Sequence, residues 1–364
     1  MSTPVLPHLF SPFSLGPLQL RNRLVMAPMT RSRANAERAV TDLHTEYYGQ
    51  RSSAGLLVTE ATSVSPQGVG YLATPGVWND VQELAWKRVT DGVHEAGGRI
   101  YLQLWHVGRV SHRAFQVDGV LPVSSSAVGF EGQTFLPDYS QAPYETPRAL
   151  ETREIAGVVQ DFENGARRAK AAGFDGVEIH GANSYLIDQF LRDGVNHRTD
   201  AYGGSVQNRT RFALEVVDAV VGVWGPGKVG MRVSPLSPWN GMSDSDPHTL
   251  FTYVARELQG RGLAYLHVVE SLPQDGADLV ITPVLRQAFG GVVIANGGYT
   301  ADRAEATLAA GAADLVAFGV PYIANPDLAE RFQQGAELNT SDPKTFYGGD
   351  AKGYTDYPAL SATR

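Results

Sequence analysis

Short apolar runs rich in β-branched residues recur along the chain, and longer segments with a helical period separate them. The segments between the runs, DVQELAWKRVTDGVHEAG and RTRFALEVVDAVVGVWG among others, place their apolar residues on one helical face. Strands alternating with helices in this way predict an α/β fold, a single closed parallel (β/α)8 TIM barrel. The predicted strands occupy residues 23–28, 56–64, 99–105, 176–181, 228–235, 264–270, 291–298 and 314–320.

An open doubly wound sheet is the alternative fold for this alternation. Such a sheet normally has a Gly-rich turn directly after its first strand. Here the first strand ends in APMTRSRA, which contains no glycine. The closed barrel is therefore favoured.

The segment from Thr152 to Gly173 illustrates the helical period. Thr152 is a candidate N-cap, and Gly173 follows the predicted end of the helix. The apolar residues that recur on one face are Ile155, Val158, Val159, Phe162, Ala166 and Ala169. Gly176 then opens the fourth strand.

Two stretches stand outside the repeat. Residues 107–150 follow the third strand and carry Gly, Pro and Ser too densely for a helix, so they predict a long insertion that acts as a lid over the barrel. The start of the chain, HLFSPFSLGPLQLRN, predicts a β-hairpin that closes the N-terminal end of the barrel. The sequence shows no linker that would separate two domains, so residues 1–364 are expected to form one domain.

Composition narrows the class of protein. The chain is 43% hydrophobic and 19% charged, which is typical of a globular protein with a large core. A net charge of −8 with scattered Lys and Arg argues against a nucleic-acid partner, and the absence of cysteine excludes disulfides and thiolate chemistry. The N-terminus lacks a basic start, and no apolar run reaches about 18 residues, so we expect a cytoplasmic protein away from membranes.

The predicted strand ends are polar or small, at the place where TIM barrels carry their active sites. Thr30, Gln103 and Arg232 offer a hydroxyl, an amide and a guanidinium, a set suited to the edge of a flat heterocycle. Gly297-Gly298 and Gly319 follow the last two strands, where backbone amides can approach a phosphate closely. A phosphorylated planar cofactor such as FMN would match both the polar side chains and the glycines.

Each of these features also has a simpler explanation. A Gln or Thr at a strand end is often an ordinary loop residue, and the glycines can serve tight turns. His106, beside Trp105, fits a structural hydrogen bond better than catalysis. His106 and His180 could ligate a metal, but no carboxylate stands at a matching spacing, so no metal site is expected.

Longer motifs carry a family resemblance. They are LRNRLVMAPMTRSRA (20–34), QLWHVGR (103–109), DGVEIHGANSYLIDQFLRDGVNHRTDAYGGSVQNRTRF (175–212), GMRVSP (230–235), ANGGYT (295–300), ANPDL (324–328) and GYTDYP (353–358). Together they resemble the Old Yellow Enzyme family of FMN-dependent ene-reductases. The resemblance covers essentially the whole chain in the right order.

The resemblance implies a tightly bound, non-covalent FMN reduced by NADPH or NADH. Pro28 and Thr30 would border the flavin's C4 carbonyl, Ala61 and Gln103 its pyrimidine side, and Arg232 its N1 and C2 carbonyl. The residues expected at the phosphate are Gly298, Gly319 and the amide of Val320.

The resemblance also implies a substrate side. His180 and Asn183 would donate hydrogen bonds to a carbonyl or nitro oxygen, and Tyr185 would donate the proton. Tyr71, Trp105 and Tyr347 would border the pocket. The implied reaction is ping-pong reduction of the C=C bond of an enone or nitroalkene, by a monomer or homodimer.

Three positions depart from the family pattern. Val320 stands where many members have an Arg that reaches the phosphate, and losing such a charge-assisted hydrogen bond costs roughly 1.5–3 kcal/mol. A cation from Arg31, Arg33 or the lid could replace it. The loops at Leu236–Asn240 and Ser271–Gln274 also differ in character, so substrate scope does not carry over.

Two other functions remain possible for such a barrel. One is a flavin-free lyase or isomerase that acts on a phosphorylated substrate. The other is a flavin-storage or ligand-binding barrel. Flavin absorbance separates the first from an ene-reductase, and reduction of the flavin by NADPH separates the second.

Overall fold

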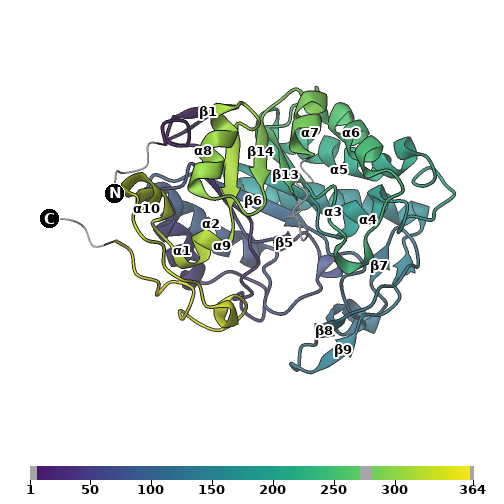
Figure 1. Ribbon diagram of the computed structural model, residues 1–364. Helices are drawn as coiled ribbons and strands as arrows, with labels where there is room; N and C mark the ends of the chain where they lie inside the picture. The colour runs from purple at the N-terminus through teal and green to yellow at the C-terminus, as the bar shows by residue number, and fades with distance from the viewer. Residues whose placement is uncertain (1–5, 271–280, 361–364) are drawn as a thin grey trace.

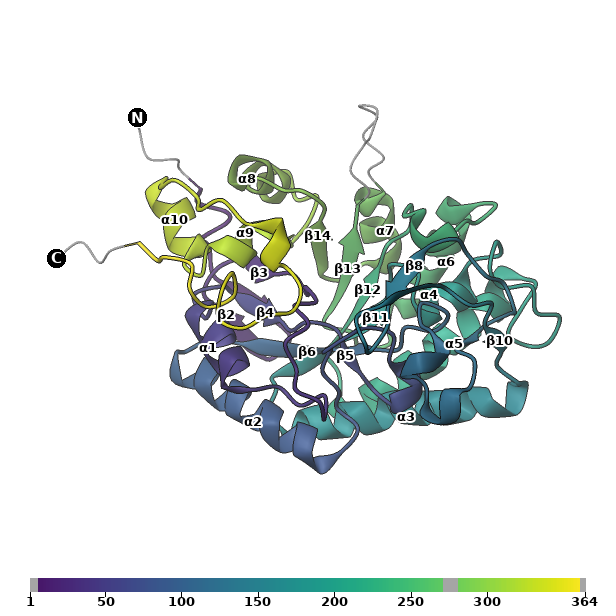
Figure 2. The ribbon, with the colours of Figure 1, turned by 90° about the horizontal axis from the view of Figure 1, so that it is seen from below.

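A computed structural model describes residues 6–270 and 281–360. Eight parallel strands close into a barrel, with β15 pairing β3 and β6 pairing β11. The helices lie around the outside of these strands (Figures 1 and 2). The barrel strands are β3 (Leu24–Met26), β4 (Leu56–Val58), β6 (Ile100–Trp105), β11 (Gly176–Gly181), β12 (Val229–Val233), β13 (Tyr265–Val269), β14 (Val293–Asn296) and β15 (Leu315–Phe318).

Each predicted run contains one barrel strand, so the predicted (β/α)8 architecture is confirmed. A short extra strand, β5 (Thr62–Ser63), also pairs with β6. The helices are α1 (Asp42–Gln50), α2 (Asp80–Glu95), α3 (Thr152–Ala171), α4 (Leu186–Leu191), α5 (Val206–Trp224), α6 (Pro247–Leu258), α7 (Thr282–Phe289), α8 (Ala301–Ala309), α9 (Val320–Ala324) and α10 (Leu328–Gln334). Single 3-10 turns are η1 (Pro66–Gly68), η2 (Arg113–Phe115), η3 (Val117–Gly119), η4 (Trp239–Gly241) and η5 (Pro343–Thr345).

Helix α3 buries the face predicted from its period, with Val159 only partly buried. Its N-cap, however, is Glu151 rather than Thr152. The Glu151 side chain accepts a backbone N–H at the start of the helix, while Glu154 reaches back to the Glu151 amide. Thr152 is the first helical residue, and its hydroxyl donates to Asp200 over 2.5 Å.

The N-terminal segment forms an antiparallel hairpin of β1 (Phe13–Leu15) and β2 (Leu18–Leu20). Leu15 and Leu20 are buried in one cluster with barrel residues such as Val25. Gly16 makes the turn with φ +54°, and an added Cβ would stand 2.4 Å from the Gly227 carbonyl oxygen. The hairpin therefore packs apolar side chains against the barrel interior.

The 107–150 insertion has a fixed base and a projecting tip. At its base, β7 (Val123–Ser124) pairs in parallel with β10 (Arg148–Ala149). At its tip, β8 (Gln133–Phe135) and β9 (Gln141–Pro143) form an antiparallel hairpin that stands out at the lower right of Figure 1. Within residues 6–270 and 281–360, no helix is long and apolar enough to cross a membrane.

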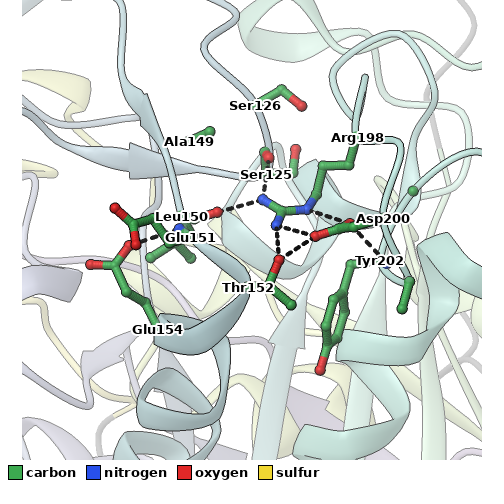
Figure 3. Close-up of polar contacts among 12 residues, drawn as sticks. Ser125, Ser126, Ala149, Leu150, Glu151, Thr152, Glu154, Arg198, Asp200 and Tyr202 are labelled. Carbon is green, nitrogen blue, oxygen red and sulfur yellow. Dashed lines mark hydrogen bonds and ion pairs between the residues drawn. The ribbon is translucent and has the colours of Figure 1, made fainter.

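A single guanidinium joins the residues that follow β7 and β10 at the base of this insertion (Figure 3). Arg198, from the loop between α4 and α5, donates to the carbonyl oxygens of Ser125 at 3.0 Å and Leu150 at 2.5 Å. Asp200 holds the same guanidinium at 2.6 Å and accepts the hydroxyl of Thr152. The base of the insertion is thus fixed to the barrel.

Candidate active site

Strand register brings five polar side chains to the barrel interior. Residues paired across parallel strands point the same way, and residues two apart on one strand share a face. Gln103 pairs with Glu178, His180 pairs with Arg232, and Arg232 pairs with His267. Since Glu178 and His180 are two residues apart, all five side chains line one surface.

Glu178 links this surface into a network. Its carboxylate accepts Gln103 Nε2 at 2.8 Å and contacts His267 Nδ1 at 2.8 Å. Burial alone would raise the pKa of Glu178, but His267, Arg232 and Gln103 together hold it below its ordinary value. The carboxylate is therefore ionised and fixes the orientation of the Gln103 amide.

Arg232 has an unused donor in this network. Its Nη2 donates to Asn296 Oδ1 at 2.8 Å, and Asn296 is held in turn by the Ala317 carbonyl. Its Nε is buried, and no acceptor for it lies among the residues that the structure describes. A buried N–H without a partner is costly, so this guanidinium suits an acceptor-rich ligand edge such as that of a flavin.

His180 is neutral, and the position of its proton follows from its contacts. The side chain is buried, and burial, Arg232 and His267 lower its pKa well below the usual range. Its Nδ1 accepts the Ala182 amide at 3.3 Å. The proton of the neutral ring is therefore on Nε2, which makes Nε2 a hydrogen-bond donor.

The turn after His180 places Asn183 and Tyr185. Asn183 and Ser184 have φ values of 57° and 70°, a region that Asn tolerates better than most residues. The Asn183 amide donates to Ser234 Oγ at 2.7 Å, and the Ser184 amide donates to Asp188 at 2.9 Å. Within the described chain the Asn183 carboxamide has no hydrogen-bond partner, so it is free for a ligand.

Aromatic rings form one wall beside this turn. Tyr71 stacks on Trp105 with centroids 5.6 Å apart, and the Tyr185 ring meets Trp105 edge-on at 4.9 Å and His180 at 4.9 Å. The hydroxyls of Tyr71 and Tyr185 are 3.2 Å apart. Burial raises the pKa of Tyr185 to about 12, so this phenol is protonated at neutral pH.

The predicted pocket residue Tyr347 is 68% exposed, and it lies near enough to Tyr185 to contribute to the raised pKa of that phenol. It belongs to residues 343–355, which are held by arginines from the loop after Thr30. Arg31 donates to the carbonyl oxygens of Phe346 and Gly353, and Arg33 donates to those of Thr345, Asp350 and Lys352. Arg31 and Arg33 are thus engaged in anchoring this segment.

The first two strand ends meet around Glu60. Pro28 and Ala61 are buried and Thr30 is partly exposed. Glu60 accepts the backbone amides of Arg31 at 3.1 Å and Ser32 at 3.3 Å, which fixes the loop after Thr30 beside Ala61. Burial raises the pKa of Glu60 to about 7.

The predicted phosphate end is made of backbone. Among the residues that the structure describes, the amides of Gly298 and Gly319 donate to no acceptor. Val320 begins α9 with its side chain 55% exposed. Arg303 contacts this end, donating to the Gly297 carbonyl at 3.3 Å, but it also faces Glu270 at 3.5 Å.

Of the two loops that depart from the family pattern, the structure describes only the first. In the loop at Leu236–Asn240, Asn240 Nδ2 donates to Ser184 Oγ at 2.7 Å and its carbonyl accepts Arg109 at 2.7 Å. This loop therefore supports the turn that carries Asn183. The loop at Ser271–Gln274 lies outside the described residues. No group of three His, Cys, Asp or Glu in the described ranges could hold a metal ion.

Sequence reasoning missed the network beneath the strand ends. Glu178, His267 and Asn296 are polar residues inside strands, and the first two are fully buried. Glu178 lies within the motif at residues 175–212 and shares a face with His180. A charged residue in the middle of a buried strand was the available signal.

Comparison with known proteins identifies the family. The model of the NADH:flavin oxidoreductase / NADH oxidase family matches residues 8–339. The chain belongs to this family, the Old Yellow Enzyme family. The predicted family is therefore confirmed.

Curated relatives and solved structures resemble this family member over nearly its full length. A putative 12-oxophytodienoate reductase 11 of Oryza sativa subsp. japonica is 46% identical, covering 97% of both chains. The 12-oxophytodienoate reductase 2 of Arabidopsis thaliana is 44% identical, covering 98% of this chain and 96% of that one. Morphinone reductase in complex with tetrahydroNAD is 53% identical with a TM-score of 0.93, covering 98% of each chain. The old yellow enzyme homologue from Zymomonas mobilis is 41% identical with a TM-score of 0.94, covering 97% of this chain and all of that one (100%).

Proposed function

We propose that the protein is an FMN-dependent ene-reductase that uses NADPH or NADH to reduce the C=C bond of α,β-unsaturated carbonyl or nitro compounds in a ping-pong cycle. The observation that carries this proposal is one wall that presents a neutral imidazole and a protonated phenol together. His180 and Tyr185 have ring centroids 4.9 Å apart, and neither titrates near neutral pH. One can donate to an oxygen while the other protonates a carbon.

The residues present fit FMN at both of its ends. The unpartnered Nε of buried Arg232 calls for an acceptor, and the amides of Gly298 and Gly319 can take a phosphate. When bound, FMN supplies hydride from its N5 atom. The residues that would hold it are Pro28, Thr30, Ala61, Gln103 and Arg232 around the ring, with Gly298, Gly319 and Val320 at the phosphate.

The substrate side follows from the donors on the aromatic wall. His180 Nε2–H and the Asn183 carboxamide donate to the substrate oxygen, so negative charge that develops there meets positioned donors. The Tyr185 hydroxyl gives its proton to Cα as hydride reaches Cβ. Tyr71 and Trp105 border the pocket, and Tyr347 lies at its exposed edge.

The setting of this chemistry is also part of the proposal. Residues 1–364 form one FMN-binding domain whose 107–150 insertion covers the mouth as a lid. The protein is a cytoplasmic monomer or homodimer without a nucleic-acid partner, in keeping with its net charge of −8. A flavin-free lyase or isomerase is not favoured by membership of a flavin oxidoreductase family.

The test separates the two half-reactions by stopped-flow absorbance. We expect Tyr185→Phe to slow reoxidation of the reduced flavin by 2-cyclohexenone about 100-fold, because the general acid is gone, while reduction by NADPH changes less than about twofold. Tyr202→Phe is the matched control, because the Tyr202 hydroxyl bonds Glu215 away from the site. Equal slowing of both half-reactions would contradict the role of Tyr185 as proton donor.

A further inference from the structure

One side chain of the loop after β12 turns inward from an exposed stretch of chain. Pro238 and Trp239 are exposed, whereas the next residue, Asn240, is only partly exposed. The Asn240 carboxamide reaches the turn after β11, where its Nδ2 donates to Ser184 Oγ at 2.7 Å. Since β11 and β12 are neighbours in the barrel, this contact joins two adjacent loops at its mouth.

The direction of this hydrogen bond is fixed by the one that follows it. A hydroxyl has a single proton to donate, and the Ser184 hydroxyl donates its proton to the carbonyl oxygen of Asn183. The group that meets Ser184 Oγ must therefore be a donor, so the amide nitrogen of Asn240 fits there and its oxygen does not. Two hydrogen bonds in series thus run from Asn240 to the backbone of Asn183.

The peptide between Asn183 and Ser184 is the group that these two hydrogen bonds hold. Both residues have left-handed φ values, 57° and 70°, in a region that is unfavourable for Ser. The amides of the two residues donate to Ser234 and Asp188, and the carbonyl of Asn183 accepts the Ser184 hydroxyl. Rotation of this peptide would release Ser184 from the left-handed region, and the contact from Asn240 opposes that rotation.

Asn240 is itself held by the 107–150 insertion. Its φ is 53°, a left-handed value that Asn tolerates, and its carbonyl accepts Arg109 Nη2 at 2.7 Å. Arg109 is fully buried, and its Nη1 donates to the Val128 carbonyl at 3.0 Å. The same guanidinium lies 5.1 Å from the centroid of the Phe130 ring. The loop backbone at Asn240 is therefore fixed independently of its side chain.

We propose that Asn240 is a positioning residue for the reduction of substrate. By holding the peptide that follows Asn183, it keeps the Asn183 carboxamide in the direction in which this group donates to the substrate oxygen. Asn240 acts only through Ser184 and the Asn183 backbone and takes no part in the transfer of hydride or proton. This inference rests on the proposed function, since it requires Asn183 as a donor to the substrate.

Two variants of Asn240 remove the donor and keep the backbone of the loop. Asn240→Gly retains the left-handed φ without a carboxamide, and Asn240→Asp retains the shape but cannot donate. In both we expect the dissociation constant of 2-cyclohexenone, obtained from saturation of the flavin reoxidation rate in stopped flow, to rise about fivefold. Agreement of the two variants excludes the added charge of Asp as the cause.

The affinity for FMN and a change elsewhere in the loop serve as controls. Asn183 belongs to the substrate side, so Asn240→Gly and Asn240→Asp should bind FMN like the wild type in a fluorescence titration. Ser237→Ala should leave the dissociation constant of 2-cyclohexenone unchanged, because Ser237 is held through its backbone amide, which donates to the Ser234 carbonyl at 3.2 Å.

A double mutant separates positioning of Asn183 from a separate effect on the substrate. If Asn240 acts through the Asn183 carboxamide, Asn183→Ala/Asn240→Gly should bind 2-cyclohexenone no more weakly than Asn183→Ala. A further loss in the double mutant, unchanged enone binding in Asn240→Gly, or a parallel loss of FMN affinity would each overturn the positioning role alone. Failure of the FMN-loaded wild type to reduce any enone would overturn the proposed function, and this inference with it.

Discussion

The ring end and the phosphate end of the proposed flavin site are built from different material. At the ring end, Arg232, Gln103 and Glu178 come from neighbouring strands and are buried in one fixed network. At the phosphate end, Gly298 and Gly319 offer backbone amides beside the exposed Val320. The cation of the first end is buried among charged and polar partners, whereas Arg303, the cation beside the second end, is 38% exposed.

The largest expected effect comes from removing the ring-end cation. Arg232→Met leaves the buried Glu178 carboxylate with less compensation and Asn296 Oδ1 without its donor. We expect the free energy of unfolding of the flavin-free protein to fall by about 3 kcal/mol, measured by urea denaturation.

The matched control is the same change at the other end. Arg303 is 38% exposed and only 3.5 Å from Glu270 at best, so Arg303→Met should cost about 1 kcal/mol or less. Equal losses of unfolding free energy in Arg232→Met and Arg303→Met would show that the two ends do not differ in this way.

An intermediate effect should follow from adding charge to the phosphate end. Val320→Arg supplies the guanidinium that many family members have there, and we expect FMN to bind roughly 10-fold to 100-fold more tightly. Flavin fluorescence during titration of the flavin-free protein measures this affinity.

Riboflavin separates charge from packing in that experiment, because it has the same ring and no phosphate. Its affinity should be the same in the wild type and in Val320→Arg, and Val320→Gln should bind FMN like the wild type. Tighter riboflavin binding by Val320→Arg would show that the new side chain acts on the ring.

The smallest effect is a pH dependence at the ring-end loop. The folded pKa of Glu60 is about 7, above its unfolded value, so between these values the folded protein binds the extra proton. Stability contributed by this proton is therefore lost as pH rises. From pH 5.5 to 6.5 the unfolding free energy should fall by about 1 kcal/mol relative to Glu60→Gln.

The comparison of wild type with Glu60→Gln cancels the titration of other groups. Glutamine keeps an oxygen for the amides of Arg31 and Ser32 and has no charge to lose. Parallel stability curves for the two proteins across this pH range would show that Glu60 is not held protonated by the fold.

The sequence was sufficient to predict the barrel because each strand and helix has its own local period. It was sufficient for polar strand ends such as Gln103 and Arg232, since their place on the barrel follows from strand order. The partnership of Glu178 with His267 was not predictable, because it depends on register across β11, β12 and β13. Register is fixed by packing in space and leaves no local mark on the chain.

Two smaller differences have the same kind of cause. Thr152 has the chemistry of a cap, but the helix begins one residue earlier, with Glu151 and Glu154 forming the capping box while the Thr152 hydroxyl binds Asp200. Arg31 and Arg33 were candidate phosphate cations, but they bind a segment more than 300 residues away in the chain. In both cases the partner of a polar side chain is decided by the three-dimensional arrangement of its neighbours, which the sequence does not show.

The guanidinium of Arg198 has a consequence for how this protein can change. Because it holds the carbonyls of Ser125 and Leu150, the two sides of the insertion's base are fixed by contacts that do not involve the tip between them. The segment between these two anchors can therefore be replaced without changing how the insertion is attached. Tips of other length and composition can be grafted there while the barrel stays the same.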